Sequence, residues 1–214
     1  MIDEQLVAER LRELRASIDR GRQRGEVTLC AVTKGHSAEA WRLARRLGCD
    51  AIGENYAQDV LRKHSEVGDD HPPLHFIGRL QTNKVRSLAP LVAVWQSVDR
   101  AALVAEIAKR APGAHVFVQV NATGEAEKGG CSLVEAKGLV AQARDAGLIV
   151  DGLMTVGPTD GDPTRTRSTF ATVRRLADEL QLAGCSMGMS GDLTAALTEG
   201  STLVRVGTAL FGSR

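Results

Sequence analysis

Short apolar runs rich in β-branched residues alternate along the chain with longer amphipathic stretches. This alternation is typical of stacked strand–helix units, whose strands form a parallel sheet. The sequence predicts eight strands, at Val27–Thr33, Ala51–Gly53, Leu74–Ile77, Val92–Ser97, Ala114–Asn121, Ile149–Thr155, Cys185–Met189 and Thr202–Val206.

Helical periodicity fills the stretches around these runs. In the segment Ile2–Arg22, apolar residues recur at spacings of four, three and four, which places them on one face of an amphipathic helix. A further helix is expected to begin near Tyr56. The other predicted helices are Ala38–Leu47, Thr82–Leu88, Ala101–Arg110, Leu133–Ala146, Arg165–Leu182 and the short Leu193–Thr198.

Eight strands, each followed by a helix or by the chain end, favour an α/β fold with one closed, parallel (β/α)8 barrel of the TIM type and an extra N-terminal helix. An open, doubly wound sheet is the alternative. No Gly-x-Gly-x-x-Gly follows the first strand, which argues against a dinucleotide-binding version of that sheet. The length of 214 residues fits one barrel, so we expect residues 1–214 to form a single domain.

Charge and cysteine content limit the classes of partner and of metal site that the sequence predicts. The net charge is +1, from 27 basic and 26 acidic residues, so we expect neither nucleic acid nor a membrane surface as a partner. The start of the chain has no basic or apolar leader, and we expect a cytoplasmic protein. The four cysteines, Cys30, Cys49, Cys131 and Cys185, are widely spaced, which predicts buried or free thiols and no metal site.

Lys34 directly follows the first apolar run, so its ammonium is expected at the mouth of the barrel, where barrels of this kind bind their ligands. Partial burial there lowers the pKa of a lysine and makes a neutral amine available to attack an aldehyde. An ordinary solvated loop lysine is the alternative interpretation.

The last two predicted strands are followed by a candidate phosphate site. Gly191 and Gly207 allow backbone amides to approach an anion closely, and Ser190 and Thr208 add hydroxyl donors. Ser190 or Asp192 is also a candidate cap for the short helix that follows. Plain turn chemistry remains the alternative, because Gly, Ser and Asp are common in turns.

Three further polar residues lie near strand ends. Arg205 sits within the last run and must find an acceptor, either a ligand or a salt-bridge partner at the rim. Asn55 is a candidate for a ligand hydrogen bond or for a helix cap. His75 opens the third run, away from the ligand end, and is predicted to be a core histidine.

Taken together, these residues make the chain resemble the pyridoxal phosphate homeostasis proteins, which are related to the barrel domain of alanine racemase. The resemblance runs from about Val27 to Arg214. Its matching stretches are Ala31–Lys34, Gly53–Tyr56, His75–Lys84, Gly152–Met154, Ser186–Ser190 and Val204–Thr208.

The resemblance implies a cofactor, pyridoxal 5′-phosphate (PLP), held by Lys34 as a Schiff base. It also implies a phosphate cradle at Ser190, Gly191, Gly207 and Thr208, and an Arg205 that faces the pyridine nitrogen. Asn55 completes the expected cofactor site. Thr33 stands where the family is expected to have serine, a change that keeps the hydroxyl.

The function implied by the resemblance is PLP binding in the service of intracellular PLP homeostasis, without dedicated turnover. PLP, and PLP-dependent apo-enzymes that receive it, are the implied partners of a monomer. An amino-acid racemase is the first alternative, although the only tyrosine, Tyr56, is a poor candidate for the second base. A barrel enzyme acting on a sugar phosphate without PLP is the second.

Overall fold

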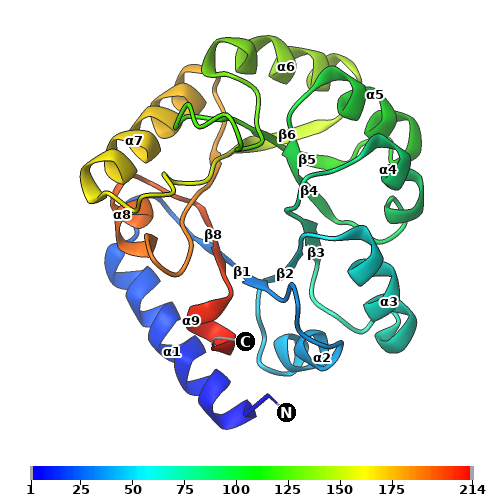
Figure 1. The fold of residues 1–214 in the computed structure, drawn as a ribbon, viewed down its shortest axis with the longest axis vertical. Helices are drawn as coiled ribbons and strands as arrows, with labels where there is room; N and C mark the ends of the chain where they lie inside the picture. The colour runs from blue at the N-terminus through cyan, green and yellow to red at the C-terminus, as the bar shows by residue number, and fades with distance from the viewer. Residues whose placement is uncertain (1, 213–214) are drawn as a thin grey trace.

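The computed structural model describes residues 2–212 and contains a closed barrel of eight parallel strands (Figure 1). The ladder follows the chain order, and β8 pairs with β1 to close the ring. The strands are β1 (Thr28–Val32), β2 (Ala51–Glu54), β3 (Leu74–Phe76), β4 (Val94–Val98), β5 (His115–Gln119), β6 (Ile149–Met154), β7 (Gly184–Ser186) and β8 (Leu203–Val206). The predicted (β/α)8 barrel is therefore confirmed.

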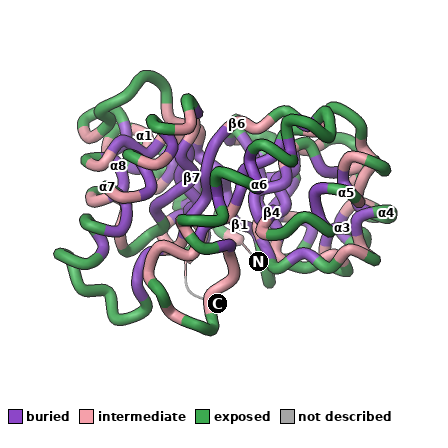
Figure 2. Tube along the Cα trace, turned by 90° about the horizontal axis from the view of Figure 1, so that it is seen from above, coloured by how far each residue is buried: buried purple, intermediate pink, exposed green. Residues whose placement is uncertain are grey.

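Helices surround the barrel, and their outward faces are exposed while the strands are buried (Figure 2). Within the described residues they are α1 (Glu4–Gly21), α2 (Glu39–Arg46), α3 (Ala57–Val67), α4 (Thr82–Leu88), α5 (Ala101–Arg110), α6 (Leu133–Asp145), α7 (Pro163–Glu179), α8 (Leu193–Thr198) and α9 (Thr208–Phe211). None of these helices combines the length and the apolar character needed to cross a bilayer.

The extra N-terminal helix α1 packs along the outside of the barrel, against α8 and α9 (Figure 1). Asp3 caps it by accepting a hydrogen bond from the amide of Leu6. Its buried residues are the four that the spacing predicts: Val7, Leu11, Leu14 and Ile18. Packing of this apolar face holds the helix on the barrel.

The buried apolar residues form two clusters, one inside the barrel and one between the strands and the helices. The smaller cluster fills the barrel and contains Cys30, Ala51, Phe117, Met154 and Leu203. The larger one joins the outward strand residues to the helices. Because side chains alternate along a strand, Leu203 and Arg205 of β8 face inward while Val204 and Val206 face the helices.

Element boundaries differ from the predicted ones by a few residues. Helix α7 begins at Pro163, earlier than the predicted Arg165, because Asp162 caps it and proline suits the first helical turn. Helix α9 was not predicted, since its four residues are too few to show periodicity.

Candidate functional site

Lys34 lies just beyond β1, at the end of the barrel that is formed by the carboxyl ends of the strands. The preceding Thr33 directs its side chain outward, toward Trp41 of α2, so Lys34 starts from the inner side of the ring. The register pairs Val32 with Gly53, which places Lys34 next to Asn55. Lys34 is exposed and makes no hydrogen bond or ion pair within residues 2–212.

A buried polar cluster fixes the backbone that carries Lys34. The hydroxyl of Thr33 donates to Glu54 Oε1 over 2.6 Å, and Lys63 Nζ donates to the Thr33 carbonyl over 2.7 Å. Lys63 also forms an ion pair with Glu54 at 2.5 Å, and both side chains are fully buried. Trp41 Nε1 donates to Thr33 Oγ1 and Glu54 Oε1. The hydroxyl expected at position 33 is thus needed for this cluster.

Asn55 follows β2 and carries an orphaned polar atom. Its side-chain oxygen is buried and has no hydrogen-bond partner. The capping interpretation is wrong, because Tyr56 occupies the N-cap position of α3 and no side chain caps the helix there. A buried amide oxygen without a partner is costly, which is typical of a group that binds a ligand.

The loops after β7 and β8, which the sequence predicts to bind a phosphate, lie side by side. Ser190 Oγ accepts a hydrogen bond from the amide of Ala209 over 3.0 Å, which ties the first loop to the start of α9. Gly191 is exposed, with open space around its Cα. At Gly207, an added Cβ would lie 3.2 Å from the carbonyl oxygen of Val32, tighter than most real contacts.

Asp192, one of the two predicted caps, occupies the N-cap position of α8, but no side chain caps the helix. Neither Ser190 nor Asp192 gives a side-chain hydrogen bond to the first turn of that helix. Asp192 Oδ1 instead accepts from the amide of Met189 over 2.5 Å, and Ser190 is engaged with Ala209. The sequence pattern could not distinguish these partners, since both residue types suit caps and loops equally well.

Arg205 crosses the inside of the barrel and is 4% exposed. Its Nη1 donates to Ser186 Oγ over 2.6 Å and its Nη2 to the carbonyl of Thr155 over 2.8 Å. Among the described residues no carboxylate forms an ion pair with it, so a salt bridge at the rim, one of the two predicted environments, is not observed. Burial lowers the pKa of Arg205 to about 10, which keeps the guanidinium protonated at neutral pH.

The hydrogen bonds continue from Arg205 to the opposite wall of the barrel. Ser186 donates to Gln96 Oε1 over 2.6 Å, and the Gln96 amide nitrogen lies 2.7 Å from His75 Nδ1. Because this nitrogen is a donor, His75 Nδ1 must accept, and the ring is neutral with its proton on Nε2. His75 is buried, as predicted, and belongs to the network that holds Arg205.

Neutral His75 gives the fold a specific acid sensitivity. Burial lowers the pKa of His75 from 6.5 to about 4, so between these values the unfolded chain binds a proton that the folded chain excludes. Its contribution to stability is complete above pH 6.5 and is lost as the pH falls toward 4. The loss is expected to reach about 3 kcal/mol.

Chemical unfolding at several pH values between 4 and 7 measures this loss. The matched variant is His75→Asn, whose side-chain oxygen replaces the acceptor but does not titrate in this range. Between pH 4 and pH 7, the unfolding free energy of the parent protein should rise with pH relative to that of His75→Asn. A difference that stays constant would contradict a neutral, buried His75.

All four cysteines are buried and free, as predicted. Burial raises the pKa of Cys30 to about 12, so its thiol is inert at neutral pH. The described residues contain no group of three His, Cys, Asp or Glu side chains suited to a metal ion.

Comparisons with known proteins place the chain among PLP-related barrels. The family model described as the N-terminal domain of alanine racemase matches residues 2–214. The pyridoxal phosphate homeostasis protein of Pseudomonas aeruginosa is 39% identical, over 97% of this chain and 93% of its own. That of Aquifex aeolicus is also 39% identical, over 91% of this chain and 90% of its own.

Solved structures agree in fold. PipY of Synechococcus elongatus with PLP bound has a TM-score of 0.84 at 32% identity, covering 96% of this chain and 100% of PipY. Alanine racemase of Corynebacterium glutamicum has a TM-score of 0.79 at 16% identity, covering 100% of this chain and 62% of the racemase. The second likeness concerns the fold alone.

Proposed function

Because the chain belongs to the pyridoxal phosphate homeostasis proteins, a family built on the alanine racemase N-terminal barrel, we propose that it binds PLP and serves intracellular PLP homeostasis. PLP supplies an aldehyde that forms a Schiff base with an amine and a pyridine ring that draws electrons. Lys34 is the residue that we propose to carry it.

The observation that carries this proposal is the combination of groups at one end of the barrel. The unpaired amine of Lys34 follows β1, and the two phosphate loops follow β7 and β8. Since β8 pairs with β1, the loop that carries Lys34 and the loop that carries Gly207 and Thr208 start from neighbouring strands, which supports an amine and a phosphate site side by side. PLP requires this pair of groups, one for its aldehyde and one for its phosphate.

The phosphate is expected to bind the hydroxyls of Ser190 and Thr208 and the backbone amides around Gly191 and Gly207. The hydrogen bond from Ala209 to Ser190 holds the two loops in one cradle. Asn55, whose buried oxygen lacks a partner, supplies a polar contact beside Lys34.

Arg205 is the proposed partner of the ring nitrogen. Two of its N–H groups bind Ser186 and Thr155, which leaves further N–H groups of the guanidinium to donate. A protonated guanidinium can donate to a pyridine nitrogen but cannot share a pyridinium proton. The ring therefore stays a weak electron sink, which supports binding without turnover.

The phosphate cradle predicts separate effects on PLP and on pyridoxal. Ser190→Ala and Thr208→Ala each remove a hydrogen bond to a charged group, worth about 1.5–3 kcal/mol, and should weaken PLP binding roughly tenfold or more. Ser190→Ala should cost more, because it also frees the amide of Ala209. Fluorescence titration of each variant measures the affinity.

Pyridoxal, which has no phosphate, is the control ligand for this titration. Its affinity should change little in either variant, apart from the small effect of loosening the Ser190 loop. An equal loss for PLP and pyridoxal would place the phosphate elsewhere.

The absence of dedicated turnover is part of the proposal and has its own test. Two-base racemisation needs a positioned proton carrier opposite Lys34, worth about 10²–10⁴-fold in rate. The only tyrosine, Tyr56, is 63% exposed at the start of α3. Incubation with D- or L-alanine in deuterated water should give negligible α-proton exchange by NMR. Exchange at roughly 1–10³ s⁻¹ would contradict the absence of turnover and favour the racemase.

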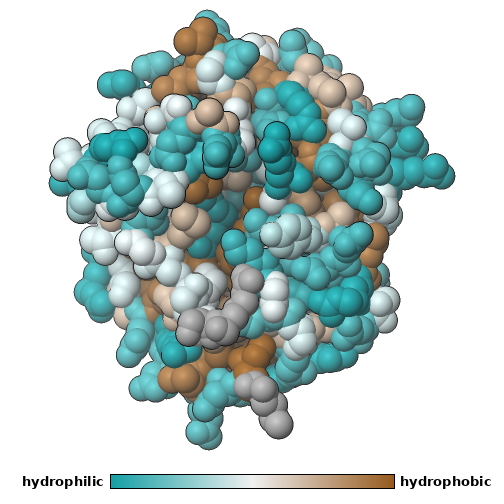
Figure 3. All heavy atoms as spheres, in the orientation of Figure 1, coloured by the Kyte–Doolittle hydropathy of each residue, from teal (hydrophilic) through white to brown (hydrophobic). Residues whose placement is uncertain are grey.

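We also infer that the protein works as a monomer in the cytoplasm and supplies PLP-dependent apo-enzymes. Four free thiols fit a reducing compartment. The large exposed apolar residues come mostly from separate elements, and hydrophilic side chains dominate the rim of the face in Figure 3. Size-exclusion chromatography with light scattering tests the monomeric state.

A further inference from the structure

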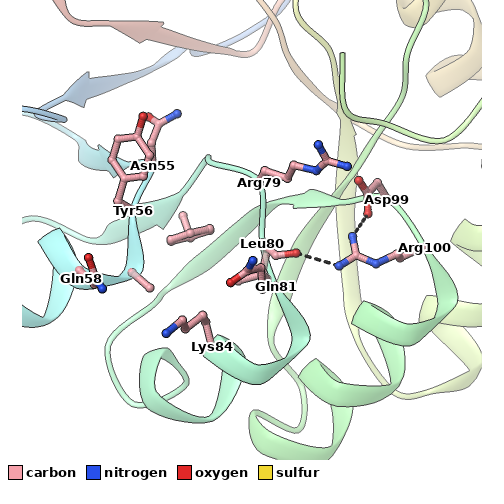
Figure 4. A pocket seen from close by; sticks show the side chains of 11 residues that line it. Asn55, Tyr56, Gln58, Arg79, Leu80, Gln81, Lys84, Asp99 and Arg100 are labelled. Carbon is pink, nitrogen blue, oxygen red and sulfur yellow. Dashed lines mark hydrogen bonds and ion pairs between the residues drawn. The ribbon is translucent and has the colours of Figure 1, made fainter. Parts of the chain in front are cut away.

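A second cleft opens at the same end of the barrel as Lys34. It is lined by the loops after β2, β3 and β4 and has a volume of about 860 Å³ (Figure 4). In the closed order of strands, β3 lies opposite β7, so the cleft lies across the mouth from the phosphate loops. Arg79, Leu80, Gln81 and Lys84, which the PLP site does not use, form one of its walls, and Asn55, which we also assign to the PLP site, lines it from the loop after β2.

The cleft carries a surplus of positive charge. Arg79, Lys84 and Arg100 line it together with a single carboxylate, Asp99, which leaves a formal charge of +2. Arg100 is engaged, because it pairs with Asp99 at 2.5 Å and donates to the carbonyl of Leu80 over 2.9 Å. Arg79 and Lys84 make no side-chain hydrogen bond or ion pair within the described part of the chain.

The two unpaired cations lie on different sides of an apolar floor. In Figure 4, the guanidinium of Arg79 extends toward Asp99, whereas the ammonium of Lys84 extends toward Gln58 at the start of α3. Leu80 lies between them, and Phe76 also lines the cleft; both are 2% exposed. Because the two cationic groups extend in different directions, a molecule with an anionic group at each end can pair with both of them.

From this arrangement we propose that the cleft is a second ligand site, which binds a small aliphatic dicarboxylate. One carboxylate pairs with Arg79, whose planar guanidinium can bind both of its oxygens, and the other pairs with Lys84. The methylene groups between them rest on Leu80 and Phe76. The charge of the ligand, −2, then balances the charge of the cleft.

Titrations of the PLP-free protein with succinate, glutarate and adipate, followed by calorimetry, test the site and select the chain length that fits. The best of the three should bind at least roughly tenfold more tightly than the monoacid of the same length. Arg79→Gln or Lys84→Gln should reduce the diacid to the affinity of that monoacid. Arg86→Gln is the matched control, because Arg86 is an exposed cation on α4 that does not line the cleft, and it should change nothing.

The same titrations separate this site from the PLP cradle. Diacid affinity should be unchanged in Lys34→Ala and Thr208→Ala, and PLP affinity should be unchanged in Arg79→Gln. Equal affinity for diacid and monoacid, equal loss in Arg86→Gln, loss in Thr208→Ala or no binding of any diacid would each overturn the proposal. Thermal unfolding of each variant confirms that the comparison is made on folded protein.

Discussion

Replacing Lys34 with alanine is expected to abolish the yellow absorbance that the protein acquires with PLP, while leaving its unfolding free energy nearly unchanged. The side chain of Lys34 is exposed and has no partner in the described chain, so its removal leaves neither a cavity nor an orphaned polar group. The buried Thr33, Glu54 and Lys63 remain to hold the loop. The absorbance spectrum with PLP, before and after borohydride, measures the effect.

Lys84→Ala is the matched control, because Lys84 is a second unpaired lysine at the same end of the barrel. This variant should keep the full absorbance. If Lys34→Ala retains a borohydride-reducible chromophore at the strength of the unmodified protein, another lysine holds PLP and the assignment is wrong.

Gly78→Ala is expected to be the most destabilising glycine-to-alanine substitution near the site. A Cβ at Gly78 would lie 1.9 Å from the carbonyl oxygen of Asn55, a backbone atom that cannot move aside alone. Relief requires that the loops after β2 and β3 separate. We expect a loss of about 3 kcal/mol or more, which corresponds to roughly 6–12 °C in Tm for a domain of this size.

Gly138→Ala on α6 is the control, since no atom lies within 4 Å of its added Cβ and alanine favours a helix. That variant should gain up to about 1 kcal/mol. The displacement of Asn55 in Gly78→Ala should also weaken PLP binding. A Gly78→Ala protein as stable as the parent would show that the two loops separate easily.

The barrel could be predicted from the sequence because its strands and helices have distinct periodicities. The apolar face of α1 and the exact limits of α4, α5 and α8 came from local pattern alone. Helix α9 was missed because its four residues carry no pattern, and β4 lies further along the chain than the predicted Val92–Ser97. The apolar residues of a run do not show at which residue the hydrogen bonds to the neighbouring strands begin.

The polar networks could not be predicted in the same way. Ser186 and Gln96 are 90 positions apart, and only closure of the barrel brings them together. The partner of Arg205 was therefore open between a ligand and a salt bridge, whereas its buried acceptors are a hydroxyl and a backbone carbonyl. The buried ion pair of Glu54 and Lys63 was not predicted, although Glu54 directly precedes Asn55. No local sequence pattern indicates that two such residues will pair in the interior.

The candidate site itself was predictable as a set of strand ends. Lys34, Asn55, Ser190 and Gly207 all lie at the end of the barrel where the strands terminate, as barrel geometry requires. Their roles toward PLP remain predictions. Arg79, after the third strand, could be identified from the sequence as a possible cation for a carboxylate, but its cleft with Lys84 could not, since that depends on which cations stay unpaired after folding.

Identification of the residue that holds PLP tests the central claim most directly. The protein is incubated with PLP, reduced with borohydride, digested and analysed by tandem mass spectrometry. The account predicts one phosphopyridoxyl group, on Lys34. Modification of another lysine at equal occupancy, or of none, would contradict it.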